Sequence, residues 1–319
     1  MGKLSIAVSP HIKSPVTTQR IMLDVIIAMI PALIASIILF GIRSLLVCAF
    51  CVAVCVASQY VFELLCKKET QIGDLSAVVT GMLLAFNLPV SIPLWQAAVG
   101  SIVARVIVKE LFGGIGNNFA NPAITARVVM LMAFSSSMTT WIAPLGADLY
   151  SGATPLALIA EEKIGQLPSI VDMLLGRRGG CLGETCAIAL VMGGVYMIAR
   201  GVIKWHTPVF FVGTVAVAAL LYSGFDVRFT LYQILSGGLI LGAFFMATDY
   251  ATTPPTPLGK AVFGIGCGLI TAVIRFWGSY PEGVSFAILL MNILTPYISN
   301  LTRHKIFGAI KVKKGGKAV

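Results

Sequence analysis

Long apolar stretches alternate with short polar breaks along the whole chain, and this alternation predicts a bundle of membrane-crossing helices. A helix needs about 20 predominantly apolar residues to cross the hydrocarbon core of a bilayer. Residues 21–40 and 44–65 meet this requirement most clearly. In total we predict ten spans, at approximately 21–40, 44–65, 74–89, 94–111, 122–135, 183–200, 208–223, 230–247, 259–277 and 284–301.

The third and fifth spans are shorter than the others or are broken by Gly, Asn and Pro. Inside a membrane, such a break is tolerated only where neighbouring protein or water satisfies the freed backbone groups. We therefore expect these two spans to face a cofactor or a cavity rather than lipid.

The order of segments in 81–128 reappears in 238–292. Each stretch has a Gly-containing span, a polar turn with prolines, a span that ends in an aromatic residue and Gly, and then another span. Repeats are common in transporter folds, whose sites lie where the repeats meet. We divide the chain into an N-terminal segment (1–20), a first membrane half (21–135), a long loop (136–182), a second membrane half (183–301) and a basic tail (302–319).

Composition supports this division and excludes a soluble enzyme. Of the 319 residues, 57% are apolar and only 11% are charged, against roughly 25% charged in soluble domains. The mean hydropathy is +0.92. We expect an all-α integral membrane protein. The chain has no P-loop, no GxGxxG after a strand and no His pair at metal spacing, so its chemistry would come from a bound cofactor or from transport.

The net charge of +10 is distributed unevenly. With the N-terminus inside, fifteen basic residues fall in the inner segments, six of them in the C-terminal tail, whereas the outer segments hold few, among them Arg43, Arg177, Arg178 and Arg228. This bias predicts that both termini are cytoplasmic, which ten spans also require. The first 20 residues are polar and lack the apolar core of a signal peptide. Nucleic-acid binding has no support, because the basic residues lie in short caps between spans.

Cys48, Cys51 and Cys55 lie on one apolar span. Closely spaced thiolates can hold iron–sulfur clusters, but cysteine also packs well as a small apolar residue. Their Val, Ala and Phe neighbours favour packing. We predict no metal site.

Three polar residues near breaks are candidate ligand contacts. Asn121 precedes Pro122, an ordinary helix N-cap arrangement that also directs free N–H groups at polar ligand atoms. Arg127 follows within the span, where a charge indicates either a function or an ion pair. Asp249, before Pro254, could cap a turn or line a cation or flavin pocket.

Four other acidic residues lie near predicted span ends, where a solvated charge needs no special role. They are Asp24, Glu63, Glu110 and Glu184. Asp24 fits this interpretation least well.

The segment Ser151-Gly152-Ala153-Thr154 lies in the long loop, which the charge bias places outside the cytoplasm. Ser, Gly and Thr cluster in turns for local reasons. A threonine beside small residues could alternatively carry a covalently attached group. The residues alone leave both interpretations open.

Several segments, in order and with compatible spacing, together resemble the RnfD/NqrB family of membrane subunits. The resemblance covers essentially the whole chain, and the length is similar to that of RnfD members rather than the longer NqrB members. The segments are Ser9-Pro10-His11, Thr17-Thr18-Gln19-Arg20-Ile21-Met22, Asn121-Pro122-Ala123, Ser151-Gly152-Ala153-Thr154-Pro155-Leu156-Ala157 and Ala247-Thr248-Asp249.

This resemblance implies a covalent FMN, joined to Thr154 by a phosphoester bond that a separate flavin transferase forms. Ser151, Gly152 and Ala153 complete the attachment site. It also implies a second, non-covalent flavin (riboflavin or FMN) within the bundle, and a fold of two repeats related to urea channels. We take Asn121, Arg127 and Asp249 as candidate flavin contacts.

The implied function is that of an electron-transfer subunit, not catalytic alone, in an Rnf-type ferredoxin:NAD⁺ oxidoreductase complex of a prokaryotic cytoplasmic membrane. Its partners would be the other Rnf subunits (A, B, C, E and G types), and the complex would move Na⁺ or H⁺. A flavin suits this role because it exchanges single electrons. The alternatives are a small-solute channel or transporter, which the repeats and interrupted spans suggest, and a structural membrane subunit without a redox group.

Overall fold

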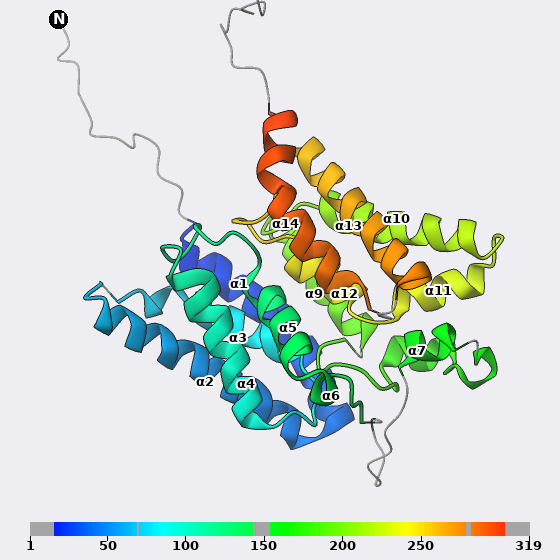
Figure 1. Cartoon of the computed structure of the whole chain (residues 1–319), viewed down its shortest axis with the longest axis horizontal. Coiled ribbons are helices and arrows are strands. Elements are labelled where there is room, and N and C mark those ends of the chain that lie inside the picture. Colours follow the sequence, from blue (N-terminus) through cyan, green and yellow to red (C-terminus); the bar gives the residue numbers. More distant parts are fainter. Residues whose placement is uncertain are drawn as a thin grey trace, which may run out of the picture.

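The computed structural model describes residues 16–68, 70–142, 144, 154–161, 163–184, 186–278 and 282–303. Within these ranges, the regular elements are helices (Figure 1), as the apolar pattern predicts. They are α1 (Thr18–Phe40), α2 (Ile42–Leu65), η1 (Ile72–Asp74), α3 (Ser76–Phe86), α4 (Leu94–Ile102), η2 (Val103–Glu110), α5 (Pro122–Ala133), α6 (Ser135–Met138), α7 (Pro155–Ala160), η3 (Ile164–Gln166), α8 (Ile170–Leu175), α9 (Ala187–Ala199), α10 (His206–Tyr222), α11 (Val227–Leu235), α12 (Leu239–Leu241), η4 (Gly242–Met246), α13 (Pro257–Trp277) and α14 (Val284–Leu301).

Four of these helices, α1, α2, α13 and α14, are long and apolar enough to cross a membrane. The bent pair of α11 with α12–η4, whose two parts meet at 64°, makes a fifth if it is one span. The chain is therefore an integral membrane protein. The five remaining predicted spans coincide with shorter helices. These are α3, α4 together with η2 that continues it, α5, α9 and α10.

Helix α1 shows how these helices meet lipid. Beyond its polar first turn, its exposed side chains are apolar and follow one face, at Leu23, Ile27, Ile30, Ile34 and Ile38. A helix that is apolar on its outer face as well as its inner face is typical of a membrane span.

The bundle has two faces, which we define by the chain segments that lie there. At the terminal face, α1 begins and α14 ends, both at the top of Figure 1. Thr302, just after α14, contacts Thr256, just before α13, through their hydroxyl groups at 2.9 Å. At the opposite, loop face lie residues 134–142 and the start of α7, and there Ser91 donates a hydrogen bond to the carbonyl of Thr140.

Helix α3 is short and almost completely enclosed. Helix α5 is also short, but only its first half is mostly buried, and Val129 and Met132 are exposed in its second half. The prediction that these two spans face the interior therefore holds for α3 and for the first half of α5.

Beyond α3, the backbone N–H groups of Leu182 and Gly183 donate to the carbonyls of Leu88 and Phe86. This contact satisfies carbonyl groups that a helix end leaves free. Only glycine fits at position 183, because a Cβ there would lie 2.3 Å from the Cβ of Phe86.

Glycine residues also allow the backbones of longer helices to approach each other closely. Helix α9 packs on α1, where a Cβ at Gly193 would lie 2.1 Å from the carbonyl oxygen of Ala28. Helix α13 packs on α10 through Gly264 and Gly268, which form a GxxxG spacing. Small residues at such crossings are the usual basis of helix association in membranes.

Candidate functional site

Two cavities penetrate the bundle, one toward each face. The loop-face cavity, of about 420 Å³, is lined by Thr154 and Arg127 among others. The terminal-face cavity, of about 290 Å³, is lined by Asn121 and Asp249 among others. These volumes are at or near the range of small-molecule sites.

Thr154 is the N-cap of the short helix α7. Its Oγ1 accepts a hydrogen bond from the backbone N–H of Ala157 at 3.2 Å, and Pro155 follows at the first helical position. The side chain is half-buried and lines the loop-face cavity. The other three predicted attachment residues, Ser151, Gly152 and Ala153, lie outside the described residues.

Arg127, in α5, is buried at the wall of the same cavity and forms ion pairs with two carboxylates. Its Nη1 lies 2.8 Å from Glu184 Oε1, and its Nη2 contacts Glu282 Oε2. Nη1 also donates to Asn87 Oδ1 at 2.6 Å. The ion-pair interpretation of Arg127 is therefore confirmed, and its positive charge lies at the cavity wall.

The rest of this cavity combines positive charge with apolar and aromatic surface. Arg178 is buried in the wall and donates to the carbonyl of Glu184 at 2.7 Å. Trp141, Leu131 and Met138 line the other sides. A planar aromatic ligand with an anionic tail matches these surfaces.

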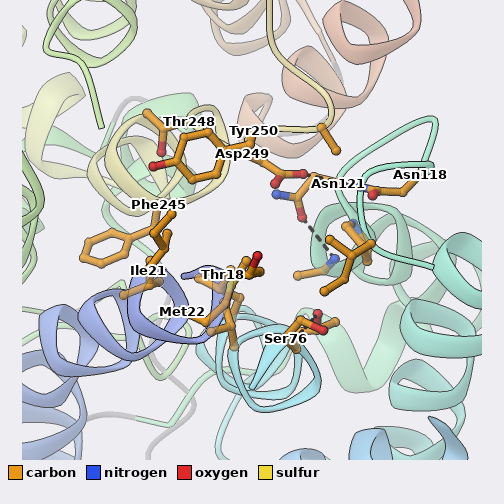
Figure 2. Close-up of a pocket in the computed structure, with 18 of the residues that line it drawn as sticks. Thr18, Ile21, Met22, Ser76, Asn118, Asn121, Phe245, Thr248, Asp249 and Tyr250 are labelled. Atoms are coloured by element: carbon orange, nitrogen blue, oxygen red, sulfur yellow. Dashed lines mark hydrogen bonds between the residues drawn. The ribbon is translucent and has the colours of Figure 1, made fainter. Parts of the chain in front are cut away.

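The terminal-face cavity collects polar groups from distant parts of the chain. Figure 2 shows Thr18 of α1, Ser76 of α3, Asn121 just before α5 and Asp249 around one space. The amide and hydroxyl groups among them can bind the polar edge of a ring or a sugar-like chain.

Asn121 and Asp249 each combine a structural role with a position in this wall. Asn121 caps α5, accepting from the N–H groups of Ala123 and Ile124 at 3.1 and 3.3 Å, and its Nδ2 donates to the carbonyl of Met246 at 3.1 Å.

Asp249 Oδ2 accepts from Thr252 at 3.2 Å and from Asn118 at 3.4 Å. Burial raises the pKa of Asp249, and the nearby ammonium of Lys109 opposes this rise. Asp249 therefore caps a turn, as predicted, and it also lines the terminal-face cavity.

The predicted flavin contacts thus fall into two sets rather than one. Arg127 belongs with Thr154, whereas Asn121 belongs with Asp249. Helix α5 is common to both, because Ala123 lines the terminal-face cavity and Arg127 lines the loop-face cavity. These two residues are one helical turn apart, about 6 Å along the axis.

The prediction that four acidic side chains are solvated is wrong, since all four are buried. A charge removed from water needs a partner, and each has one: Tyr196 and Arg200 for Asp24, Gln59 for Glu63, Arg105 for Glu110, and Arg127 for Glu184.

Sequence reasoning also missed Asn87, Lys109, Arg178 and Glu282 as cavity or network residues. For Glu282 the sequence does hold a signal that could have indicated a buried site. This residue is charged, stands beside Gly283 and lies in a short break between two apolar spans.

The three cysteines of α2 are buried in the helix packing, in agreement with the interpretation favoured from sequence. Among the described residues, no three His, Cys, Asp or Glu side chains form a group that could hold a metal ion.

Comparison with known proteins gives one consistent family. The model of the NQR2, RnfD, RnfE family matches residues 5–308. The D subunit of the Na⁺-translocating ferredoxin:NAD⁺ oxidoreductase complex of Acetobacterium woodii is 47% identical, covering 99% of this chain and 98% of the relative.

Two further relatives are each 38% identical. One is the D subunit of the proton-translocating ferredoxin:NAD⁺ oxidoreductase complex of Clostridium ljungdahlii, and the match covers 95% of this chain and 96% of the relative. The D subunit of an ion-translocating oxidoreductase complex of Stutzerimonas stutzeri is matched over 92% of both chains.

Proposed function

Because the chain belongs to the NQR2, RnfD, RnfE family, we propose that it is a membrane electron-transfer subunit of an ion-translocating ferredoxin:NAD⁺ oxidoreductase complex. Relatives matched over nearly their full length are named as the D subunit of such complexes. Its partners are then the other subunits of the complex, and it is not catalytic alone.

The redox group we propose is an FMN joined to Thr154 by a phosphoester bond. The observation that carries this proposal is the position of the Thr154 side chain at the wall of a cavity of about 420 Å³. The hydroxyl oxygen is held by the helix start that it caps, so the attachment atom is placed without any contribution from the ligand.

The residues of the loop-face cavity fit such a group. Arg178 and Arg127 supply positive charge at the cavity wall, which favours an anionic group such as a phosphate. Trp141 and the apolar wall suit a flat ring system. The bound flavin would accept and donate single electrons, with the surrounding charges setting its potential.

For the terminal-face cavity we propose the second, non-covalent flavin. Asn121, Asn118 and Asp249 would contact its polar edge, and Lys109 in the same wall adds a cation. Arg127 is assigned to the first flavin, because it lies in the other cavity.

We further propose ten crossings in two inverted halves, related to urea-channel folds, with both termini cytoplasmic. Two features support this arrangement. Helix α2 packs along α3 and α4 as α10 packs along α11 and α13. In addition, α1 begins at the terminal face, whereas α9 ends there, where Tyr196 donates to Asp24.

The test is to co-express the chain with a flavin transferase and to look for flavin fluorescence in the denatured gel band. We expect fluorescence from the unsubstituted protein and none from Thr154→Ala. Thr139→Ala is the matched control, because it removes another hydroxyl that lines the same cavity, and it should stay fluorescent.

Fluorescence retained in Thr154→Ala would place the flavin elsewhere. A non-fluorescent unsubstituted protein would favour one of the other two functions. A small-solute channel would then be distinguished from a purely structural role by solute flux into proteoliposomes.

A further inference from the structure

Two carboxyl groups meet at the wall of the loop-face cavity, and the flavin proposed at Thr154 does not by itself account for them. Glu184 comes from the segment before α9 and Glu282 from the segment before α14, and both line the cavity. Both approach the backbone where α11 breaks from α12. A Cβ at Gly238 would lie 2.7 Å from Glu184 Oε1 and 2.9 Å from Glu282 Oε1.

Arg127 holds this pair on the other side. Its guanidinium contacts one oxygen of each carboxyl group, and the backbone N–H of Gly238 donates to Glu282 Oε1 at 3.1 Å. The guanidinium group occupies the place between the two carboxylates where a metal cation would otherwise bind. The carboxyl groups can therefore still bind or release a proton.

The two carboxyl groups differ in their surroundings. Glu184 is buried and also lies beside Arg178, whereas the side chain of Glu282 is 20% exposed at the cavity wall. Burial raises the pKa of Glu282 to about 7, Arg127 opposes this rise, and Glu184 adds to it. Where two carboxylates share a site, the pKa of one of them is raised, because the charge of the other favours its protonated form.

Other charged groups facing Glu282 are few among the described residues. Arg178 lies in the segment before α9, and Arg275 of α13 donates to the carbonyls of Gln233 and Ser236 while acting on Glu282 at longer range. The thiol of Cys181 is buried next to Arg127. With both carboxylates ionised, the guanidinium groups of Arg127, Arg178 and Arg275 leave this region with one net positive charge.

We propose that Glu184 and Glu282 form a proton-binding pair, which takes up one proton when an electron reaches the flavin at Thr154 and releases it when the electron leaves. This inference rests on the proposed function. For each electron that a donor of the complex gives up to the flavin, the Glu282 carboxylate would gain one proton from the aqueous phase, by way of the loop-face cavity that it lines. No bond between heavy atoms forms or breaks.

The electrostatic reason is direct. A negative charge added a short distance from a carboxylate favours its protonated form. Electron and proton together leave the charge of this enclosed region unchanged, which avoids the large cost of an unbalanced charge in a medium of low dielectric constant.

The experiment is a redox titration of the full-length, flavin-loaded protein between about pH 6 and pH 8.5, a range that brackets the raised pKa of Glu282, with dithionite as reductant. Uptake of one proton per electron lowers the potential by up to about 59 mV for each tenfold fall in proton concentration. Protons taken up by the flavin itself contribute equally in every variant. We therefore expect a steeper pH dependence in the unsubstituted protein than in Glu282→Gln, and recovery of the slope in Glu282→Asp.

Glu161→Gln is the matched control. Glu161 follows α7, is exposed and pairs with Lys163, so its removal should leave the slope unchanged. An identical slope in the unsubstituted protein and in Glu282→Gln, with covalent flavin present in both, overturns the proposal.

A second measurement tests the proposal even if the Glu282→Gln variant does not fold. The redox-difference infrared spectrum of the unsubstituted protein should contain a carboxylic-acid C=O band on reduction, shifted in D₂O and displaced in Glu282→Asp. A spectrum without that band, from protein whose gel band is fluorescent, refutes the proton-binding pair but leaves the proposed function intact. Absence of gel fluorescence refutes the proposed function, and the pair with it.

Discussion

Arg127 shows how one side chain can fix the geometry of a buried site. It bridges Glu184 and Glu282, which come from segments about 100 residues apart in the sequence, and it also binds Asn87 beyond the end of α3. Its guanidinium therefore ties four parts of the chain together at the cavity wall.

Removing this cation should be strongly destabilising. In Arg127→Met two carboxyl groups would remain in an enclosed space without their partner, and losing one member of a buried ion pair costs roughly 3–5 kcal/mol. The free energy of unfolding in detergent is the measurement.

Arg177→Met is the control for that measurement. Arg177 is exposed and lies 3.8 Å from Asp172, and exposed pairs contribute about 1 kcal/mol or less. Replacing Glu184 and Glu282 with Gln in the Arg127→Met background should restore most of the loss. Equal effects of the Arg127 and Arg177 substitutions would contradict the structural role of Arg127.

At the scale of helices, contact between α1 and α9 depends on the absence of a side chain. Gly193 lies against the carbonyl of Ala28, and the adjacent Gly194 lies against the ring of Phe244. Gly193→Leu should separate α1 from α9, because the clash is with backbone and cannot be relieved by a change of side-chain rotamer.

The measurement is the yield of monodisperse protein and its thermal midpoint in detergent. Gly213→Leu provides the comparison, since Gly213 is in α10 and has no atom within 4 Å of an added Cβ among the described residues. We expect a large loss for Gly193→Leu and little change for Gly213→Leu. Similar behaviour of the two variants would show that this crossing does not limit stability.

The helices could be predicted from the sequence because apolar length and Gly or Pro breaks are local properties. The prediction of α13 and α14 is accurate to within two residues, and the shortness of α3 and α5 follows from their breaks. The long-range ion pairs could not be predicted in this way. Nothing near Glu282 in the sequence indicates that Arg127 is its partner, and a carboxylate at a span end is equally compatible with solvent.

At the scale of the whole molecule, the two proposed flavins would occupy separate cavities and should therefore bind independently. Asp249→Leu removes a polar group from the terminal-face cavity only. We expect this variant to lose the flavin that is released on denaturation and to keep the flavin that stays with the gel band. Thr154→Ala should show the opposite pattern, and simultaneous loss of both flavins in Asp249→Leu would contradict independence.

The orientation of the molecule is a second prediction at this scale. Cys66 is exposed after α2, at the terminal face, whereas Ser223 follows α10 at the loop face. In a background without other cysteines, a membrane-impermeant maleimide should label Ser223→Cys on intact cells. Cys66 should react only after the membrane is permeabilised, and the reverse pattern would place the termini outside.

The single helical turn of α5 between Ala123 and Arg127 also has an electrical consequence. Where cavities enter a membrane protein from opposite faces, the transmembrane voltage falls mainly across the thin septum between them rather than over the full bilayer thickness. An elementary charge that crosses the whole voltage drop gains or loses about 2.3 kcal/mol per 100 mV. The thin wall at α5 therefore makes charge movement over about 6 Å sensitive to most of the membrane potential.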